Sequence, residues 1–552
     1  MPAIRAKVLG VLLCLPLAAR GQAPPACTAP TVETLAGPVC GKVSEVPAGT
    51  GTLSASAYLG LRYAQPPVRW QNPRPLSSSW TTPLQATEFG SICPQSTPKP
   101  IPGCPRPIPS QSEDCLFLNV WVPSGTAAGA KLPVMVFIHG GAFFEGSGSA
   151  PLFDGTYLAA SGKVIVVTFN YRLGSLGFLA LHGISTSTNN NFGFRDQLLA
   201  LGWVKDNIAG FGGDPANVTI FGESAGAMSV GLHALVSPQS SGLFKAAMME
   251  SNPLGVPYKT LKDASKLGAT FSDLVGCHGC IFGNRAKCLR GKTAEELVKA
   301  EASVWLSLGG LQNLMAWAPA IDGKLITGQP LAAAGKLPVP MVLGTNRDEG
   351  ILFTPGKLTQ VGYDLLLPAI VGKSHAAKVR RTAPYICSND DCAAQMTQVA
   401  TDYLFTCPNR YLAVHAAAAA GAKPIYVYDF TQVSNFNFWP AVPRCEGKVC
   451  HGDELPYVFH TPQGVCPADA FTPPEDTLSR TMASYWASFG ARQDPNNGGG
   501  LFTWSPFAPD KAYLILNEQL ETADDPLSKA ANCELWDSIG YETAAKGKHT
   551  SR

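Results

Sequence analysis

The chain has 552 residues, of which 45% are hydrophobic and 15% are charged, and its formal net charge is +2. A chain of this length and composition can bury roughly three quarters of the surface that its unfolded form exposes, so we expect a globular protein. The nearly balanced charge excludes a strong basic or acidic field, and we therefore expect no nucleic acid or polyanionic partner.

The N-terminus has the pattern of a secretory signal peptide. Basic residues precede an apolar stretch at residues 8–19, and small residues follow as far as Ala23. The alternative is an N-terminal membrane anchor, but the apolar stretch is shorter than the ~20 residues needed to span a bilayer. We therefore expect a signal peptide at residues 1–23, one domain at residues 24–552, and a secreted protein, extracellular or periplasmic, without stable membrane insertion.

The sixteen cysteines fit an oxidising compartment better than a reducing one. Cys277 and Cys280 have the spacing of half a zinc site, but no second half follows, and Cys288 offers a disulfide partner instead. We therefore expect structural disulfides and no bound metal. Short spacing also makes two further pairs plausible, Cys27 with Cys40 and Cys387 with Cys392.

Apolar runs of strand length alternate with helix-length stretches along the chain. The strand-length runs are residues 134–138, 164–169, 218–221, 246–249, 341–343 and 425–428, and the clearest helix-length stretches are 195–208 and 293–308. This alternation predicts a mainly parallel sheet with helices on both faces. In such sheets the reactive groups lie at the carboxyl ends of the strands.

The run Gly-Glu-Ser-Ala-Gly at residues 222–226 matches the pattern of a serine held on a sharp turn between a strand and a helix. A serine hydroxyl is a poor nucleophile unless it projects away from its neighbours and a base takes its proton. Glycines on both flanks remove side chains that would clash in so tight a turn. The flanking segments predict a strand before the serine and a helix after it, so the run predicts Ser224 as the nucleophile of an acyl-transfer enzyme.

A second glycine-rich run, His139-Gly140-Gly141, follows the predicted strand at residues 134–138 and would face the serine. In the fold that uses such a turn, the partners follow in the order serine, acid, histidine. His451 lies in a glycine-containing loop and is the candidate base, with His460 as its main rival.

The acid must be a carboxylate that orients and stabilises the imidazolium. Asp348 and Glu349 both follow the predicted strand at residues 341–343, and spacing does not choose between them.

The chain resembles the type B carboxylesterases of the α/β-hydrolase superfamily, which include cholinesterases, bacterial para-nitrobenzyl esterases and some fungal lipases. The matching stretches are residues 113–120, 139–143, 170–174, 211–226, 348–350 and 451–452. They extend over nearly the whole chain, so no cut between domains is expected. The resemblance implies an α/β-hydrolase fold: a large, mainly parallel central sheet flanked by helices, with loop and helical insertions over the active site.

The resemblance also implies roles for individual residues. It assigns a catalytic triad of Ser224, Glu349 and His451, and an oxyanion hole formed by the N–H groups of Gly140, Gly141 and Ala225. Each such donor is commonly worth about 3 kcal/mol in the transition state. It further implies disulfides joining Cys93 with Cys115, Cys277 with Cys288, and Cys407 with Cys533. Structural ion pairs are implied between Arg69 and Glu113 and between Arg172 and Asp196.

Two departures from the family pattern carry information. The segment from Cys93 to Cys115 contains no tryptophan, whereas in cholinesterases this loop holds one that stacks on the choline cation. A choline ester is therefore a poor candidate substrate. Cys445 and Cys450 lie directly before the proposed base, and a disulfide there would either stiffen the loop that carries His451 or only stabilise the fold.

We expect a secreted serine carboxylic-ester hydrolase that acts on a small-molecule ester through an acyl-enzyme, with no cofactor and no metal. One alternative is an interfacial lipase acting on glycerides, with the proline-rich loop at residues 94–112 as its lid. Another is a non-catalytic adhesion or binding homologue, because a fold does not by itself imply turnover.

Overall fold

The computed structural model describes most of the chain. The described residues are 27, 30–49, 51–96, 109–186, 188–278, 284–307, 315–388, 390–496, 502–508, 510–524 and 527–541. The expected signal peptide at residues 1–23 lies outside them, as do Cys280 and residues 97–108 of the proline-rich loop.

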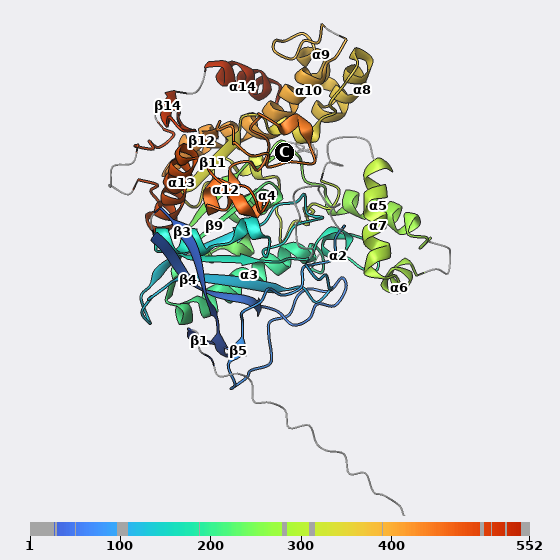
Figure 1. The fold of residues 1–552 in the computed structure, drawn as a ribbon. Coiled ribbons are helices and arrows are strands. Elements are labelled where there is room, and N and C mark those ends of the chain that lie inside the picture. The colour runs from blue at the N-terminus through green and yellow to red at the C-terminus, as the bar shows by residue number, and fades with distance from the viewer. Residues whose placement is uncertain are drawn as a thin grey trace, which may run out of the picture.

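A large sheet forms the centre of the molecule (Figure 1). Its described strands are β3 (Lys42–Ala48), β4 (Gly51–Arg62), β6 (Phe117–Pro123), β7 (Leu132–Ile138), β8 (Ile165–Phe169), β9 (Gly213–Glu223), β10 (Ala246–Glu250), β11 (Met341–Asn346), β12 (Ile425–Phe430), β13 (Ala512–Leu516) and β14 (Glu521–Asp524). Their order is β14-β13-β12-β11-β10-β9-β7-β8-β6-β4-β3. The strands from β13 to β8 pair in parallel, while both ends of the sheet are antiparallel. The predicted large, mainly parallel sheet is confirmed.

A second, small sheet packs near the N-terminal end of the described chain. It consists of β1 (Thr31–Thr34), β2 (Gly37–Cys40) and β5 (Leu84–Gln85), in that order. A disulfide between Cys27 and Cys40 anchors the first described residue to this sheet.

Helices follow most strands of the central sheet. Their bounds are α1 (Thr156–Gly162), α2 (Gly174–Phe178), α3 (Phe192–Asn207), α4 (Ala225–Leu235), α5 (Leu261–Leu274), α6 (Arg285–Arg290), α7 (Ala294–Ser307), α8 (Gln360–Val371), α9 (Lys373–Val379), α10 (Ala393–Ala400), α11 (Cys407–Ala417), α12 (Leu455–Phe459), α13 (Pro473–Arg492) and α14 (Leu527–Ile539). The helices α5–α7 form an insertion between β10 and β11, and α8–α11 form another between β11 and β12 (Figure 1).

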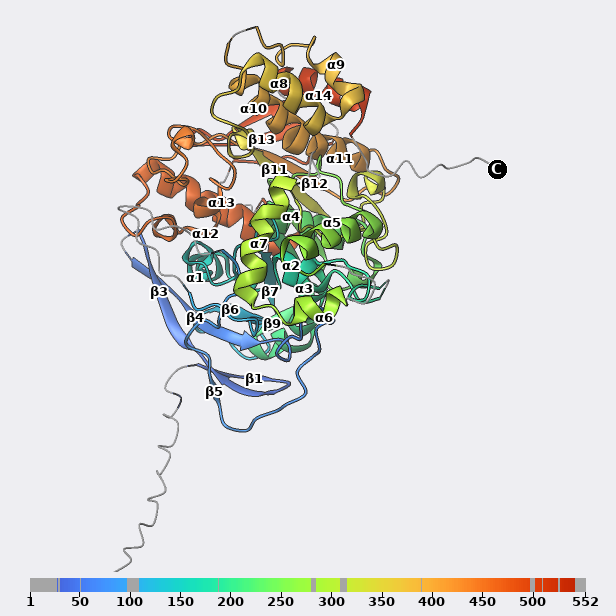
Figure 2. The same cartoon turned by 90° about the vertical axis from the view of Figure 1, so that its right-hand side faces the viewer.

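The two faces of the sheet build two separate apolar cores. On β7, Val134, Val136 and Ile138 belong to a core with residues of α3, α4 and α11. Met135 and Phe137 point to the other face and join a core with residues of α1, α12 and α13. Figure 2 shows these two groups of helices on opposite sides of the strands. Because both faces of β7 are covered, its apolar run is continuous rather than alternating.

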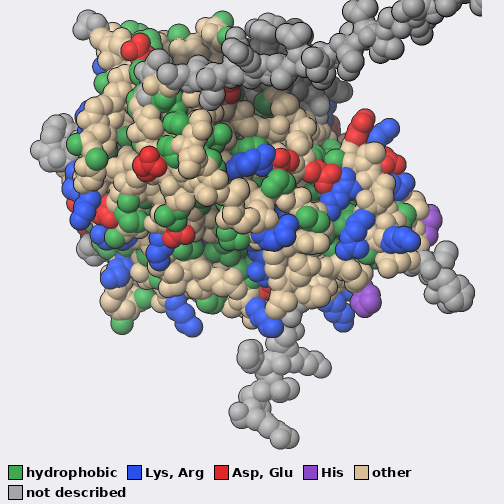
Figure 3. All heavy atoms as spheres, turned by 90° about the horizontal axis from the view of Figure 1, so that it is seen from below, with side chains coloured by type: hydrophobic (Ala, Val, Ile, Leu, Met, Phe, Trp, Pro, Cys, Tyr) green, Lys and Arg blue, Asp and Glu red, His purple; other side chains and the backbone are tan. Residues whose placement is uncertain are grey.

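Six disulfides lie within the described residues. The pairs are Cys27–Cys40, Cys93–Cys115, Cys277–Cys288, Cys387–Cys392, Cys407–Cys533 and Cys445–Cys450. Within the described part of the chain, no helix has the length and apolar character needed to cross a bilayer. Figure 3 shows Lys and Arg side chains spread over one face of the molecule, with Asp and Glu among them.

Candidate active site

Ser224 lies on a sharp turn between the end of β9 and the start of α4. Its backbone angles are φ 55° and ψ −121°, a region that non-glycine residues rarely occupy and that costs on the order of 1–3 kcal/mol. The turn also passes very close to β7: a Cβ at Gly222 or Gly226 would lie 2.5 or 1.9 Å from the carbonyl oxygen of Ile138. Glycine is therefore required at both positions by contact with β7.

Neighbouring strands hold the serine turn in place. The N–H of Ser224 donates to the carbonyl of Glu250 at the end of β10, at 3.0 Å. The Ser224 carbonyl accepts from Met228 at 2.8 Å, which begins the hydrogen-bond ladder of α4. Ser224 is only 6% exposed, so its hydroxyl lies in a site largely shielded from water.

The glycine-rich loop after β7 lies against Ser224. A Cβ at Gly140 would lie 3.2 Å from the Cβ of Ser224, and Gly141 has a φ of 101°. Among the described residues, no acceptor takes a hydrogen bond from the N–H of Gly140, Gly141 or Ala225. Ala225 is also the first residue of α4, where the helix dipole favours negative charge. These three N–H groups therefore lie close to the serine and have donor capacity for an anionic oxygen.

His139 fixes the glycine-rich loop. Its Nδ1 donates to the carbonyl of Gly140 at 2.8 Å, and its ring stacks on Tyr171 with centroids 4.4 Å apart. Burial lowers the pKa of His139 to about 4, so the ring is neutral at pH 7. His139 therefore holds the glycine-rich loop beside the site as an uncharged side chain.

His451 pairs with Glu349. The His451 Nδ1 donates to Glu349 Oε2 at 2.5 Å, and the other carboxylate oxygen accepts from the N–H of Asn346 at 2.8 Å. His451 is 5% exposed and Glu349 is fully buried. This contact fixes the ring orientation and leaves Nε2 as the nitrogen that can exchange a proton.

Asp348, the other carboxylate that spacing allowed, points elsewhere. Its Oδ2 accepts from the N–H of Val449 at 2.9 Å and forms an ion pair with Arg347. The Asp348 N–H donates in turn to the Val449 carbonyl at 2.9 Å. Asp348 therefore ties together the two loops that carry Glu349 and His451.

His460, the rival base, lies at the end of α12 in a different environment. Its ring stacks on Tyr157 with centroids 3.8 Å apart, and its Nδ1 contacts the Ser479 hydroxyl at 2.8 Å. Burial lowers the pKa of His460 to about 4, although nearby Asp476 acts in the opposite direction. These contacts attach His460 to α1 and α13 rather than to the serine turn.

Carboxylates and aromatic rings surround the His451 imidazole. The rings of Phe353 and Phe405 lie 5.1 and 5.0 Å from it, centroid to centroid. Glu223 Oε1 lies 3.0 Å from His451 Nε2, so a second carboxylate faces the imidazole. Burial lowers the pKa of His451, but Glu223 and Glu349 outweigh it and hold the pKa well above the usual value of 6.5.

Two further buried glutamates lie in the same region, and sequence reasoning missed both. Glu250 Oε1 accepts from the Trp486 indole at 2.8 Å, and Glu454 Oε2 accepts from Asn346 at 2.5 Å. Burial raises the pKa of Glu250 to about 8, and burial together with neighbouring carboxylates raises that of Glu454 well above its usual value. Glu250 is the last residue of β10, and Glu454 lies on the same loop as the candidate histidine; these positions are the signal that could have revealed them.

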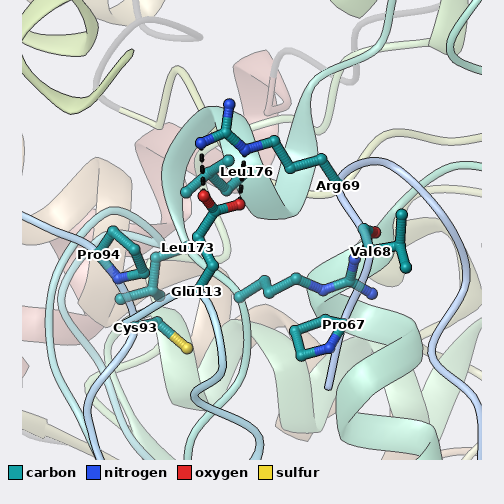
Figure 4. A pocket seen from close by; sticks show the side chains of 9 residues that line it. Pro67, Val68, Arg69, Cys93, Pro94, Glu113, Leu173 and Leu176 are labelled. Carbon is teal, nitrogen blue, oxygen red and sulfur yellow. Dashed lines mark hydrogen bonds and ion pairs between the residues drawn. The ribbon is translucent and has the colours of Figure 1, made fainter. Parts of the chain in front are cut away.

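The pair Arg69 and Glu113 lies at the base of the loop closed by the Cys93–Cys115 disulfide. Figure 4 shows the guanidinium making two hydrogen bonds to the Glu113 carboxylate. The pair lines a cavity of about 10 Å³. A cavity of this volume holds no more than about one water molecule. The neighbouring Arg172 donates to buried Asp196 at 2.7 and 2.8 Å. The two ion pairs join residues that are 44 and 24 positions apart in the chain.

Within the described residues, no group of three or more His, Cys, Asp or Glu side chains is arranged to hold a metal ion. Cys277, which the sequence placed in a possible half zinc site, is bonded to Cys288.

The serine turn, the facing glycine loop and the histidine–glutamate pair lie together in the structure. Residues 28–536 match the model of the carboxylesterase family, so the chain belongs to this family and is a carboxylic ester hydrolase.

Relatives of known identity agree with this family. The para-nitrobenzyl esterase of Bacillus subtilis is 36% identical over 495 residues, covering 87% of this chain and 95% of its own length. The cholinesterase of Mus musculus is 34% identical, with 92% and 86% covered. The crystal protein of Dictyostelium discoideum is 35% identical, with 91% of each chain covered.

Solved structures extend the similarity to three dimensions. A para-nitrobenzyl esterase structure superposes with a TM-score of 0.76 at 33% identity, covering 92% of this chain and 99% of that one. A thermophilic para-nitrobenzyl esterase gives a TM-score of 0.75 at 32% identity. The α/β-hydrolase fold is thereby established over nearly the whole chain.

Proposed function

We propose that the protein hydrolyses a small carboxylic ester in two steps through an acyl-enzyme on Ser224. His451 Nε2 takes the proton of the Ser224 hydroxyl as the oxygen attacks the ester carbonyl. The resulting imidazolium returns that proton to the leaving alcohol. Water, deprotonated by the same nitrogen, then attacks the acyl-enzyme and releases the acid and the serine.

The observation that carries this proposal is the 2.5 Å contact between His451 and Glu349 beside the strained serine turn. A buried carboxylate that accepts from Nδ1 fixes the tautomer in which Nε2 is the basic nitrogen. It also stabilises the imidazolium that forms in each step. Asp348 makes no such contact, so Glu349 is proposed as the acid.

The N–H groups of Gly140, Gly141 and Ala225 are proposed as the oxyanion hole. They come from the loop that packs on Ser224 and from the first turn of α4. Donors held in place before the reaction stabilise the tetrahedral oxyanion without reorganising, and this is commonly a large part of the rate enhancement.

The substrate is proposed to be a neutral ester with an aromatic or simple alcohol rather than a choline ester. Two solved relatives are named for para-nitrobenzyl esters. The segment between Cys93 and Cys115 has no tryptophan to receive a quaternary ammonium group. A comparison of para-nitrobenzyl acetate with acetylthiocholine tests this choice, and faster turnover of the choline ester would contradict it.

We further propose that residues 1–23 are removed on export and that residues 24–552 act as one catalytic unit. The six disulfides in the described chain support export, because such bonds persist in oxidising compartments. N-terminal sequencing of the protein recovered from the medium or periplasm tests the cleavage site.

Replacement of the nucleophile tests the proposal. Ser224→Ala is expected to abolish turnover of para-nitrophenyl esters without unfolding the protein, whereas Ser161→Ala, on α1 across the sheet, is expected to retain it. Undiminished turnover by the Ser224 variant would refute the assignment. A wild-type rate that jumps only when a glyceride forms an emulsion would favour a lipase, and the absence of both turnover and organophosphate labelling would favour a binding homologue.

A further inference from the structure

The loop directly before His451 contacts the loop that carries Glu349. These contacts are additional to the hydrogen bond between the imidazole and the carboxylate. We name residues 444–450 the histidine-side clip and residues 346–355 the acid loop. The clip contains Arg444 and the Cys445–Cys450 disulfide, whose second cysteine is the residue before His451.

Arg444 joins the clip to the acid loop through backbone carbonyls. Its guanidinium donates to the carbonyl of Ile351 at 2.6 Å, to that of Thr354, and to that of Pro355 at 3.3 Å. The aliphatic part of the side chain also passes Gly356, where a Cβ would lie 3.0 Å from Arg444 Cδ. Because the acceptors lie on the turn that follows Glu349, Arg444 holds the backbone of the acid loop.

The disulfide packs on the same loop. Cys445 and Cys450 form a small apolar cluster with Ile351, and both cysteines are nearly or fully buried, at 4% and 0% exposed. Partly buried Leu352, also in the acid loop, packs against this cluster. The disulfide, which joins Cys445 to the residue before His451, therefore packs against the turn after Glu349.

The peptide groups of Cys450 are held from both sides. Its carbonyl accepts from the Asn346 side chain at 2.8 Å, and its N–H donates to Asp453 at 2.6 Å. The next carbonyl, that of His451, accepts from the Trp439 indole at 2.7 Å. These contacts fix the direction in which the His451 side chain leaves the backbone.

We propose that Arg444 and the Cys445–Cys450 disulfide have a positioning role. They hold the His451 imidazole in the orientation that contacts Glu349 and faces the serine turn. This inference rests on the proposed function of these three residues. A general base must be held within about 0.5 Å and 10–20° of its productive geometry, and a 1 Å misplacement can cost about 100-fold in rate.

A purely stabilising clip is the alternative, and loop length argues against it as the main role. The stabilisation that a disulfide provides through the unfolded state grows with the length of the loop it closes. Cys445 and Cys450 are separated by only 5 positions, among the shortest spans in the described chain. The chain contains a matched control, because Cys387 and Cys392 have the same separation and lie between α9 and α10.

The test compares two double variants of the whole protein, Cys445→Ser with Cys450→Ser, and Cys387→Ser with Cys392→Ser. Both are expected to lower the melting temperature by a similar amount. We expect only the first to lower kcat for a para-nitrophenyl ester, by about 10- to 100-fold with KM changed less than about threefold. Equal kcat in both double variants would overturn the proposal.

If the first double variant does not fold, substitutions of Arg444 test the proposal independently. Arg444→Ala is expected to lower kcat about tenfold with little effect on KM, and Arg444→Lys, which keeps a donor for the same carbonyls, is expected to recover most of the loss. An Arg444→Ala variant with wild-type kcat would also overturn the proposal. If Ser224→Ala keeps full turnover, the proposed triad itself is wrong. This outcome can be told apart from failure of the positioning proposal, because the Ser224 variant leaves the clip unchanged.

Discussion

His451 Nδ1 lies 2.5 Å from Glu349 Oε2, although the two residues are 102 positions apart in the chain. The contact arises because β11 and β12 are neighbouring parallel strands whose carboxyl ends lie at the same edge of the sheet. Glu349 follows β11 directly, and the segment after β12 returns to this edge with His451. The sheet topology therefore brings Glu349 and His451 together, although they are far apart in the sequence.

Glu349→Gln tests whether this carboxylate is the acid. A neutral amide cannot stabilise the imidazolium, so we expect kcat for a para-nitrophenyl ester to fall about 10³- to 10⁴-fold. The matched variant is Asp348→Asn, which removes the neighbouring charge and weakens the hydrogen bond to Val449 and the contact with Arg347. Steady-state kinetics that show an equal loss in both variants would reject Glu349 as the specific acid.

Gly141→Ala tests the glycine-rich loop. Gly141 has a φ of 101°, and a Cβ there would lie 2.2 Å from the Glu145 carbonyl oxygen, so the loop must shift. Loss of one oxyanion donor is expected to lower kcat about 10²- to 10³-fold. Gly129→Ala is the control, because Gly129 also has a positive φ but no atom within 4 Å of the added Cβ. A Gly141 variant with the kinetics of the Gly129 variant would exclude a role for this loop.

Glu223→Gln tests the electrostatics around the base. Glu223 and Glu349 raise the pKa of His451 against the effect of burial, and only the neutral ring can take the serine proton. The value of kcat/KM should therefore rise with pH through that pKa. Removal of the Glu223 charge lowers the pKa, so the acid limb should move to lower pH by about one to three units.

The control for that experiment is Glu446→Gln, an exposed glutamate in the histidine-side clip. We expect its pH–rate profile to match that of the wild type. An acid limb that stays in place in the Glu223 variant would show that this carboxylate does not act on the base.

Glu250→Gln tests the buried carboxyl beside Trp486. Burial raises the pKa of Glu250 from 4.5 to about 8, so the folded protein keeps a proton that the unfolded chain loses near pH 4.5. The stability from this group is complete below pH 4.5 and is lost as pH rises towards 8, by up to about 1.4 kcal/mol per pH unit. The variant should therefore lose less stability than the wild type between pH 5 and pH 8.

Denaturant unfolding at these two pH values measures the difference. The comparison between the variant and the wild type isolates Glu250, because the other buried carboxyls remain in both proteins. An identical change with pH in both would contradict the assignment of a raised pKa to this residue.

Local sequence patterns predicted those parts of the fold whose geometry depends on residues that are neighbours in the chain. The strand–serine–helix run around Ser224 is one example, because the glycines that it requires are neighbours in sequence. The continuous apolar runs of β7, β8 and β11 are another, because burial on both faces demands them. These patterns were sufficient to predict the mainly parallel sheet.

The antiparallel end of the sheet was harder to predict. In β3, half-buried and exposed positions alternate, and its residues include charged Lys42 and Glu45 along with Pro47. A short amphipathic segment of this kind gives a weak signal until its partner β4 is known, because pairing determines which face is covered. The strand β3 was therefore not among the predicted runs, and β4 and β6 were not predicted either.

The carboxylates around His451 depend on contacts between distant segments. Asp348 and Glu349 are adjacent, and only the turn after β11 decides which of them faces the histidine. Glu250 and Glu454 accept hydrogen bonds from Trp486 and Asn346, which come from other parts of the chain. Spacing along the sequence does not encode such contacts, so it left the acid open and missed the two further glutamates, and only the family resemblance favoured Glu349.

The most direct test of the central claim is to locate the covalent intermediate. The wild-type protein is treated with an organophosphate that carries a chromophoric leaving group, digested, and examined by tandem mass spectrometry. We predict one adduct per chain, on the Ser224 hydroxyl, with loss of ester hydrolysis in proportion to labelling. An adduct on another residue that accounts for the loss, or full hydrolysis after Ser224 is labelled, would contradict the account.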